Sequence, residues 1–364
     1  MEELVSGDIW RGRRVFITGH TGFKGSWLAL WLADLGAEVT GFALPPPAGP
    51  SLFEAARVEE LVHHVVGDVR DADDVARAVA EAQPEIVFHL AAQALVRQSY
   101  VAPVETYAVN VMGTVHVLEA CRGVASLRGV VAITSDKCYE NQEWVWPYRE
   151  TDPMGGHDPY SSSKGAAELV ITAYRRSFFE HGAGIASVRA GNVIGGGDWA
   201  ADRLIPDLIR ALLAGRRPLI RAPAAVRPWQ HVLEALSGYI LIAERLVAGD
   251  RSVGTGWNFG PANDDTKPVS WLVERLLERW GAEGWDRPEG EQPHEATLLS
   301  LDCAKARREL GWRPSMRLAG ALDQVVAWHQ SVAAGADARM VTLDQLRTYR
   351  TAMRSQPTET TRWD

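Results

Sequence analysis

The first half of the chain alternates between short apolar runs and amphipathic stretches. Apolar runs typical of strands buried in a parallel sheet span residues 14–18, 38–44, 63–66, 86–90, 129–135 and 185–189. Amphipathic stretches with helical periodicity lie at 23–35, 72–82, 106–121 and 161–180. Strands that alternate with helices predict an α/β fold, with a doubly wound parallel sheet of the Rossmann type.

The pattern changes after about residue 190. Helical patterns at 204–213, 234–247 and 268–280 are separated by short strands such as 257–259. We expect three parts: a dinucleotide-binding Rossmann domain over 1–190, a smaller α/β substrate lobe over 191–343 whose chain crosses back to the first domain, and a peripheral tail over 344–364. A length of 364 residues agrees with two structural units.

Composition and charge exclude several classes of function. The net charge of −8 argues against a nucleic-acid partner, because such proteins present a basic surface. The longest run without charged residues, 39–53, contains four prolines and is too short to span a membrane. The first eight residues contain no apolar signal core, and the three cysteines are scattered. We therefore expect a cytoplasmic protein without a metal site.

A glycine-rich turn, Thr18-Gly-His-Thr-Gly-Phe-Lys-Gly25, follows the first strand and opens the first helix. Gly19 permits the tight turn, Gly22 lets a pyrophosphate approach the helix N-terminus, and Gly25 allows close helix packing. An ordinary strand-to-helix turn with coincidental glycines is the alternative. The turn predicts a dinucleotide site that includes Gly19, Thr21, Gly22, Phe23 and Gly25.

The adenosine end of this site has one supporting residue and one missing feature. Asp68 follows the third strand, where it could accept a hydrogen bond from an adenine amino group or simply cap a turn. The second strand ends at 41–45 without the acid that holds the ribose hydroxyls, and Glu38 lies at its opposite end. Because this acid is missing, we expect a modest affinity for the cofactor and a weaker discrimination between NAD and NADP.

Tyr160 and Lys164 are four residues apart and therefore share one face of a helix. A tyrosine, with an ordinary pKa of about 10, is a poor base, but a neighbouring ammonium and a nicotinamide cation favour its phenolate. Such a pair alone is weak evidence, since any helix can carry one. Its place after a glycine turn and beyond a strand that ends in Ser135 makes it a strong catalytic candidate.

Together these residues resemble the extended short-chain dehydrogenase/reductase family, in its nucleotide-sugar branch. The resemblance runs from about residue 13 to 328. It includes Leu90-Ala-Ala92, Asn110, Arg189-Ala-Gly-Asn192, Leu204-Ile-Pro206, Arg227-Pro-Trp-Gln-His-Val232 and the segment 301–312. Within the branch, residues 22–26, 134–141 and 152–160 look most like the CDP-glucose 4,6-dehydratases.

The resemblance implies NAD as cofactor and a nucleotide-sugar as substrate. The implied cofactor residues are those of the turn together with Asp68, Val69, Ala91, Ala92, Asn110, Tyr160 and Lys164. Tyr160 would take the C4 hydroxyl proton while hydride passes from C4 to NAD+. Loss of the C5 proton and the C6 hydroxyl, followed by hydride return to C6, would convert CDP-glucose to CDP-4-keto-6-deoxyglucose and regenerate NAD+.

The elimination requires an acid and a base beyond Tyr160. In related dTDP-glucose dehydratases, an Asp and a Glu match Asp136 and Lys137. Asp136 would protonate the leaving hydroxyl, which requires burial of the acid. Lys137 would remove the C5 proton as a neutral amine, or stabilise the enolate by its charge. Ser135 would hydrogen-bond the C4 oxygen, with Thr134 as the one-residue alternative. A structural aspartate and a solvated lysine are the plain alternatives.

The substrate diphosphate needs cationic partners. The resemblance assigns Arg227 to it, with Arg203 and Asn192 as further candidates. Each of them could equally be an ordinary surface charge or a polar loop residue without a binding role. Cytidine specificity is implied by the resemblance alone.

The 14 tryptophans are many for this length. Trp27 and Trp31 have helical spacing and are expected to pack the first helix. Trp144, Trp146 and Trp229 lie near the candidate site and could either line a sugar-nucleotide pocket or pack.

Two further interpretations remain open. One is a nucleotide-sugar 4-epimerase or reductase on the same scaffold, which would need no acid–base pair for elimination at Asp136 and Lys137. The other is a non-catalytic NAD-binding regulator.

In this family the helices at 106–121 and 161–180 pair across a dimer axis, so we expect a homodimer or a larger homo-oligomer.

Overall fold

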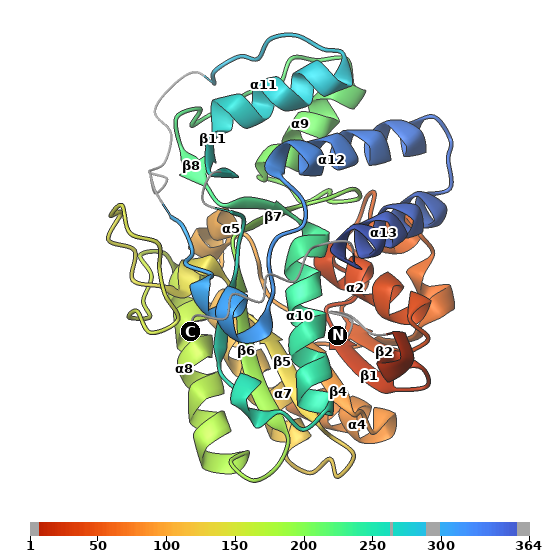
Figure 1. The fold of residues 1–364 in the computed structure, drawn as a ribbon, viewed down its shortest axis with the longest axis vertical. Coiled ribbons are helices and arrows are strands. Elements are labelled where there is room, and N and C mark those ends of the chain that lie inside the picture. Colours follow the sequence, from red (N-terminus) through yellow and green to blue (C-terminus); the bar gives the residue numbers. More distant parts are fainter. Residues whose placement is uncertain (1–6, 263–264, 289–298, 355–364) are drawn as a thin grey trace, which may run out of the picture.

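The computed structural model describes residues 7–262, 265–288 and 299–354, and its centre is a seven-stranded sheet (Figure 1). The strand order is β10-β6-β5-β4-β1-β2-β3, and every neighbouring pair is parallel. The strands are β1 Arg14–Thr18, β2 Glu38–Ala43, β3 His63–Val66, β4 Ile86–His89, β5 Gly129–Ile133, β6 Gly184–Ala190 and β10 Gly256–Phe259. The predicted doubly wound α/β fold is confirmed.

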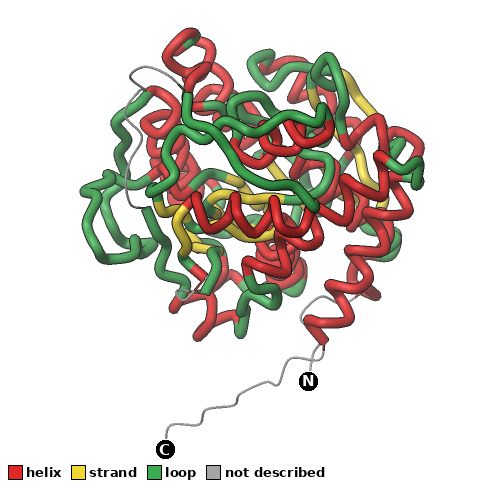
Figure 2. The backbone as a smooth tube through the Cα atoms, turned by 90° about the horizontal axis from the view of Figure 1, so that it is seen from above, coloured by secondary structure: helices red, strands yellow, loops and turns green. Residues whose placement is uncertain are grey.

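Helices cover both faces of the sheet, as the view from above also shows (Figure 2). On one face lie α2 Phe23–Asp34, α10 Val232–Val247 and α13 Ala338–Arg354. On the other lie α4 Ala72–Ala82, α7 Gly113–Cys121 and α8 Pro159–Phe178. Successive residues of β1 point to opposite faces, so that Ile17 packs in the first layer and Phe16 in the second.

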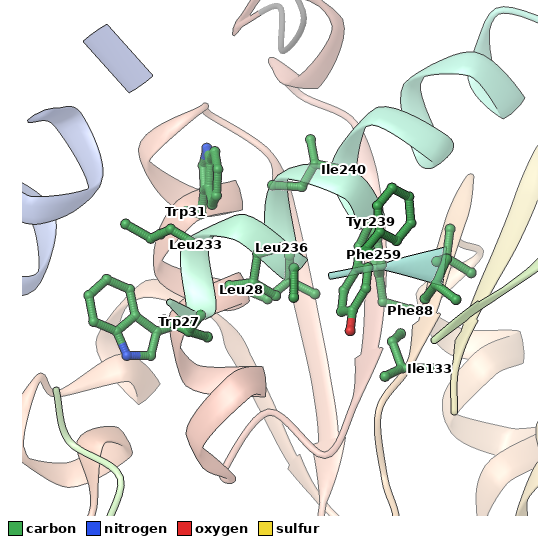
Figure 3. Packing of buried hydrophobic residues seen from close by; sticks show 14 of the residues in the cluster. Trp27, Leu28, Trp31, Phe88, Ile133, Leu233, Leu236, Tyr239, Ile240 and Phe259 are labelled. Atoms are coloured by element: carbon green, nitrogen blue, oxygen red, sulfur yellow. The ribbon is translucent and has the colours of Figure 1, made fainter. Parts of the chain in front are cut away.

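The layer formed by α2 and α10 is densely apolar (Figure 3). Trp27 and Trp31 are fully buried there, which confirms the packing interpretation of these two side chains. The Trp27 indole also donates a hydrogen bond of 3.0 Å to the Gly196 carbonyl. Helix α2 is therefore fixed on the sheet, and its N-terminus is held at the carboxyl ends of the strands.

A second apolar cluster lies above these strand ends, at the top of Figure 1. It is built by α9 Leu204–Leu213, α11 Val269–Trp280 and α12 Leu318–Ala333. Two small sheets accompany it: β7 Asn192–Ile194 pairs with β9 Trp229–His231, and β8 Val226–Arg227 pairs with β11 Lys267–Pro268. Because β7 follows β6 after one residue, this part of the chain is joined directly to the sheet edge where ligands bind in such folds.

Two predicted elements differ in the structure. The helix expected over 106–121 starts earlier, as α6 Pro103–Tyr107, and passes through a π-helical turn, Ala108–Met112, into α7. The strand expected within the smaller lobe at 257–259 instead belongs to β10, at the edge of the main sheet beside β6. Its residues are fully buried, because α10 covers this edge.

The prediction of a peripheral tail was wrong for residues 344–354. They belong to α13, in which Leu346, Tyr349 and Met353 are buried against α2 and α10. The Tyr349 hydroxyl donates to the buried Glu234 carboxylate at 3.0 Å. The apolar positions are spaced at three and four residues, but they are few among many charged neighbours, which hid the helix face. Residues 355–364 lie outside the described part of the chain.

Substitutions on α13 test whether this helix belongs to the core. Leu346→Ala removes a fully buried side chain, so we expect it to lower the free energy of unfolding by about 2–5 kcal/mol. Met340→Ala, at an exposed position of the same helix, should change it by no more than about 0.5 kcal/mol. Urea unfolding measures both, and equal effects of the two variants would contradict the docking of α13.

Candidate functional site

The glycine turn has the geometry of a phosphate-binding turn. Gly19 has φ +78°, and a Cβ there would lie 2.8 Å from the Ala91 nitrogen. A Cβ on Gly25 would lie 2.2 Å from the Gly19 carbonyl oxygen, so neither position accepts a larger residue. Gly22 is the N-cap of α2 and supplies no side-chain cap, which leaves the first N–H groups of the helix for a ligand. These residues fit the diphosphate of a dinucleotide.

The turn is also tied to its neighbours at the adenosine end. The Thr21 hydroxyl donates to the Leu44 carbonyl at 3.0 Å, just beyond β2. The His20 ring contacts His64 of β3 with 2.6 Å between ring nitrogens, in space that a Cβ on Gly41 would occupy. Burial and the neighbouring His64 lower the pKa of His20 to about 4, so this ring is neutral at physiological pH. An imidazole pair, of which His20 is buried and His64 is half-buried, thus lies beside β2, and residues 41–45 at the end of that strand include no acid.

The other predicted cofactor residues line the same strand ends. Asp68 follows β3 and is bound by the Arg70 guanidinium at 2.6 Å, which lowers the pKa of Asp68. Phe23 is half-buried at the start of α2, and the buried Val69 packs beside the helix that begins at Gly113. Ala91 and Ala92 follow β4, and the Ala91 N–H donates to Thr18 Oγ1.

Asn110 projects from the π-helical turn and uses its whole side-chain amide within the protein. Its Oδ1 accepts from the Gln93 N–H at 2.9 Å, and its Nδ2 donates to the Gln93 carbonyl and to Ser163 Oγ. Asn110 therefore joins the segment after β4 to helix α8, one residue before Lys164. The extra backbone residue of the π-turn aims this amide inward.

The structure brings Tyr160 and Lys164 together with Ser135. Both side chains are buried on the first turns of α8, and Lys164 Nζ lies 3.5 Å from the Ile133 carbonyl oxygen at the end of β5. Burial raises the pKa of Tyr160 to about 12, against the opposing effects of a hydrogen bond with Ser135 and the charge of Arg203. Burial likewise lowers the pKa of Lys164 to about 8. In the free protein, burial thus outweighs the phenolate-stabilising effect expected from the lysine.

Asp136 and Lys137 follow Ser135 in a single 3₁₀ turn, Asp136–Cys138. Asp136 is 2% exposed, and its Oδ1 accepts from the Ser135 hydroxyl at 3.0 Å. Among the described residues nothing hydrogen-bonds to its buried Oδ2. The backbone N–H of Lys137 donates to Ser135 Oγ, and its side chain is half-buried. Ser135 therefore contacts both Asp136 and Tyr160.

Two side chains that the sequence analysis did not select also belong to this cluster. Lys24, the second residue of α2, lies close enough to Asp136, Lys164 and Arg203 for their charges to act on it. Burial and the two cations lower the pKa of Lys24 to about 8. The charges of Asp136 and Tyr160 also reach the buried hydroxyl of Tyr239 on α10. The position of Lys24 within the glycine-rich turn could have indicated that it belongs to the site. No motif in the sequence indicated this for Tyr239.

A buried ion pair connects the elements that carry these groups. Glu168, one helical turn after Lys164, binds Arg189 of β6 through two bonds of 2.8 Å, and both side chains are at most 5% exposed. Glu168 also accepts from Thr134 Oγ1 at 2.5 Å. Burial opposes its ionisation, but the charge of Arg189 and the hydrogen bonds hold the pKa of Glu168 below its ordinary value. Arg189 in turn donates to the Tyr139 hydroxyl at 2.6 Å.

The three predicted substrate residues lie on α9, β7 and β8, in the part of the chain that follows β6. Arg203 is the N-cap residue of α9, lies 3.4 Å from Asp198 and acts electrostatically on Tyr160, which places it near the candidate catalytic residues. Asn192 begins β7, directly after the carboxyl end of β6. Arg227 is buried in β8, where its Nη1 donates to the Val226 carbonyl at 2.9 Å.

The three remaining tryptophans have different surroundings. Trp144 and Trp146 lie on an exposed loop, and Trp144 stacks on Tyr148 at 5.5 Å between ring centroids. Trp229 is buried in β9, and its indole Nε1 has no hydrogen-bond partner among the described residues.

Within the described ranges, no group of His, Cys, Asp and Glu side chains could hold a metal ion. No helix in that part of the chain is long and apolar enough to cross a membrane.

Comparison with known proteins gives consistent relatives. The model of the GDP-mannose 4,6 dehydratase family matches residues 16–325. A CDP-glucose 4,6-dehydratase from Salmonella typhimurium (strain LT2) is 52% identical over 96% of this chain and 99% of its own length.

Among solved structures, a dTDP-glucose 4,6-dehydratase from Streptomyces venezuelae with NAD bound superposes with a TM-score of 0.76. It is 26% identical, and the match covers 90% of this chain and 99% of that one. A UDP-glucose-4-epimerase from Stenotrophomonas maltophila reaches a TM-score of 0.77 at 22% identity, covering 89% and 100% of the two chains, and so shows the shared fold.

Proposed function

Because the chain belongs to the GDP-mannose 4,6-dehydratase family of NAD-dependent nucleotide-sugar enzymes, we propose that it dehydrates CDP-glucose to CDP-4-keto-6-deoxyglucose. The observation that carries the proposal is Asp136-Lys137 beside Tyr160 and Lys164, in a chain that is 52% identical to a CDP-glucose 4,6-dehydratase over nearly its whole length. An epimerase has no use for an added acid–base pair, which disfavours that alternative.

The cofactor would be NAD, held by the glycine turn and the residues along the neighbouring strand ends. Bound there, NAD+ would accept the substrate's C4 hydride and return it at C6. The uncapped N-terminus of α2 supplies N–H donors for its diphosphate, and the half-buried Ala91 and Ala92 after β4 have only small side chains beside the turn.

Tyr160 would receive the proton of the C4 hydroxyl at its phenol oxygen. Burial holds its pKa near 12, so ionisation to the phenolate depends on positive charge brought close to it. Lys164 supplies one such charge from the same helix face. Lys164 is therefore assigned to stabilising the phenolate and orienting the cofactor.

Asp136 would protonate the C6 hydroxyl, which leaves as water, while Lys137 takes the C5 proton and later returns it. In the proton balance of the whole reaction, the proton removed from the C4 hydroxyl ends in that water. The hydroxyl of Ser135, which contacts both Tyr160 and Asp136, is suited to pass it between them. The unpartnered Oδ2 of Asp136 is suited to face the leaving group. Arg203, Arg227 and Asn192 are proposed to bind the diphosphate.

A product assay tests the proposal. We expect the wild-type protein with NAD+ to form a 4-keto-6-deoxy sugar from CDP-glucose faster than from dTDP-, UDP- or GDP-glucose. Lys137→Met should lose at least about 100-fold in this turnover while retaining NAD+ binding, because proton removal from C5 has no substitute. Asp73→Asn, an exposed acid on α4, serves as the neutral control.

Three outcomes would contradict the assignment. A C4-inverted sugar would identify an epimerase, and cofactor binding without turnover on any of the four substrates would identify a regulator. Full turnover by Lys137→Met would exclude the role proposed for that residue.

We also propose that the protein forms homodimers through an apolar surface on α5 Val96–Val101, α6 and α8. These helices contact one another, and Val104 and Leu169 on this surface are 82% and 64% exposed. Further exposed apolar side chains there are Tyr100, Val101, Tyr107 and Phe178. A soluble monomer rarely exposes so many neighbouring apolar groups.

The three free, buried cysteines suit the cytoplasm, where we expect the dimer to work.

Leu169→Arg should convert the dimer to a monomer, because two copies of a buried arginine would meet across the symmetric interface. Light scattering after size-exclusion chromatography would then report the chain mass of 39.9 kDa in place of twice that mass. Leu213→Arg, at an exposed position on α9, should leave the mass unchanged. A wild-type monomer would exclude the proposed interface.

A further inference from the structure

A cavity of about 290 Å³ lies at the end of the sheet opposite the catalytic residues, where α8 ends and β6 begins, toward the bottom of Figure 1. Arg175 and Arg176 of α8 line it together with Arg251, and Glu180 is the acidic residue among its lining groups. Its volume is near the lower limit of small-ligand sites, roughly 300 Å³. Three cations and one anion thus meet in one cavity of a chain whose net charge is −8.

Two of the three guanidinium groups, those of Arg175 and Arg251, donate to backbone carbonyls and not to carboxylates. Arg175 Nε donates to the Ile185 carbonyl at 2.7 Å, and Arg251 Nη1 donates to the Glu180 carbonyl at 2.7 Å. Across residues 7–262, 265–288 and 299–354, none of the three forms an ion pair within 4.0 Å. Backbone carbonyls fix the side chains in place but do not neutralise them.

Arg175 carries the strongest indication of a missing ligand. Its Nη2 is buried, and no hydrogen-bond partner for it exists in the described part of the chain. A buried guanidinium N–H without an acceptor is costly, so such groups are normally paired. Burial lowers the pKa of Arg175. The negative charge of Glu168 acts against this lowering, and the positive charges of Arg189 and Arg176 add to it. The negative charge of an anion in the cavity would oppose this lowering, because it favours the charged form of the guanidinium.

We propose that this cavity, defined by Arg175, Arg176 and Arg251, is a second anion site that binds the dianionic phosphoryl group of a small molecule. Guanidinium groups bind phosphate oxygens through paired, charge-assisted hydrogen bonds, and the Nη2 of Arg175 offers an N–H that is still unused. With Glu180 included, the formal charge of the lining side chains is two positive, which matches a phosphate dianion. Free phosphate and a phosphate monoester share this chemistry.

The site is separate from the proposed catalytic centre. Tyr160 stands at the first turn of α8, and Arg175 follows it by 15 residues, or about 22 Å along the helix. The inference therefore does not depend on the proposed function. The same helix joins the two ends of the sheet, so an anion bound here would contact the far end of the catalytic helix.

Isothermal titration of the NAD+-saturated protein tests the proposal, with inorganic phosphate and glycerol 3-phosphate as separate probes. We expect saturable binding of one or both, and preference between them identifies the source. The double variant Arg176→Ala/Arg251→Ala should bind at least about tenfold more weakly, because two charge-assisted contacts are lost. Both residues are exposed, so the variant should fold normally.

Two control variants make the result decisive. Arg216→Ala removes an exposed arginine at the end of α9 and should leave binding unchanged. Arg77→Ala removes an exposed arginine on α4 and should also leave binding unchanged. Absence of phosphate binding by the wild-type protein, or equal affinity in the wild-type and double-variant proteins, would overturn the proposal.

Discussion

The geometry of the candidate site depends on the buried ion pair between Glu168 and Arg189. Glu168 belongs to the helix that carries Tyr160 and Lys164, and it accepts from Thr134, the residue before Ser135. Arg189 lies on β6 and reaches Tyr139, just after the turn that holds Asp136 and Lys137. One pair therefore connects the strand to the helix and the turn that carry the candidate catalytic side chains.

Such a pair is costly to bury and is stabilising only when its hydrogen bonds are complete. Here both Glu168 oxygens bind Arg189, and each also accepts from a hydroxyl group, of Thr134 or of Ser187. The bonds fix directions as well as distances, which apolar packing of the same volume would not do. By contrast, two of the buried polar atoms that have no hydrogen-bond partner among the described residues, Asp136 Oδ2 and the Tyr239 hydroxyl, lie in the candidate catalytic cluster. The fully hydrogen-bonded pair of Glu168 and Arg189 thus lies close to polar atoms that are free to bind a ligand.

What could be predicted from the sequence was what depends on local spacing. The glycine turn and the Tyr160–Lys164 pair each lie within one or two helical turns of chain, so their relative positions follow from backbone geometry alone. The docking of α13 on α2 and α10 and the pairing of β10 with β6 join segments that are far apart in the chain. The local sequence pattern of a segment does not show which distant segment it will contact. The pKa of Tyr160 could not be predicted either, because burial, which outweighs the neighbouring charges, is a property of the assembled core. Lys24 is an intermediate case. Its position in the turn motif could be read from the sequence, but Lys164, Arg203 and Asp136, whose charges act on it, come from three other parts of the fold.

The most direct test of this account is the turnover number of Glu168→Gln on CDP-glucose, measured beside its affinities for NAD+ and CDP. The amide keeps the shape of the side chain but removes the charge that holds Arg189, so the catalytic groups should lose their alignment while the binding residues stay in place. We expect kcat to fall by about 100-fold, because small misplacements of reacting groups have effects of this size, and both affinities to stay within about twofold of wild type. The exposed Glu38→Gln should behave as wild type. An unchanged kcat in Glu168→Gln would contradict the claim that this ion pair sets the catalytic geometry.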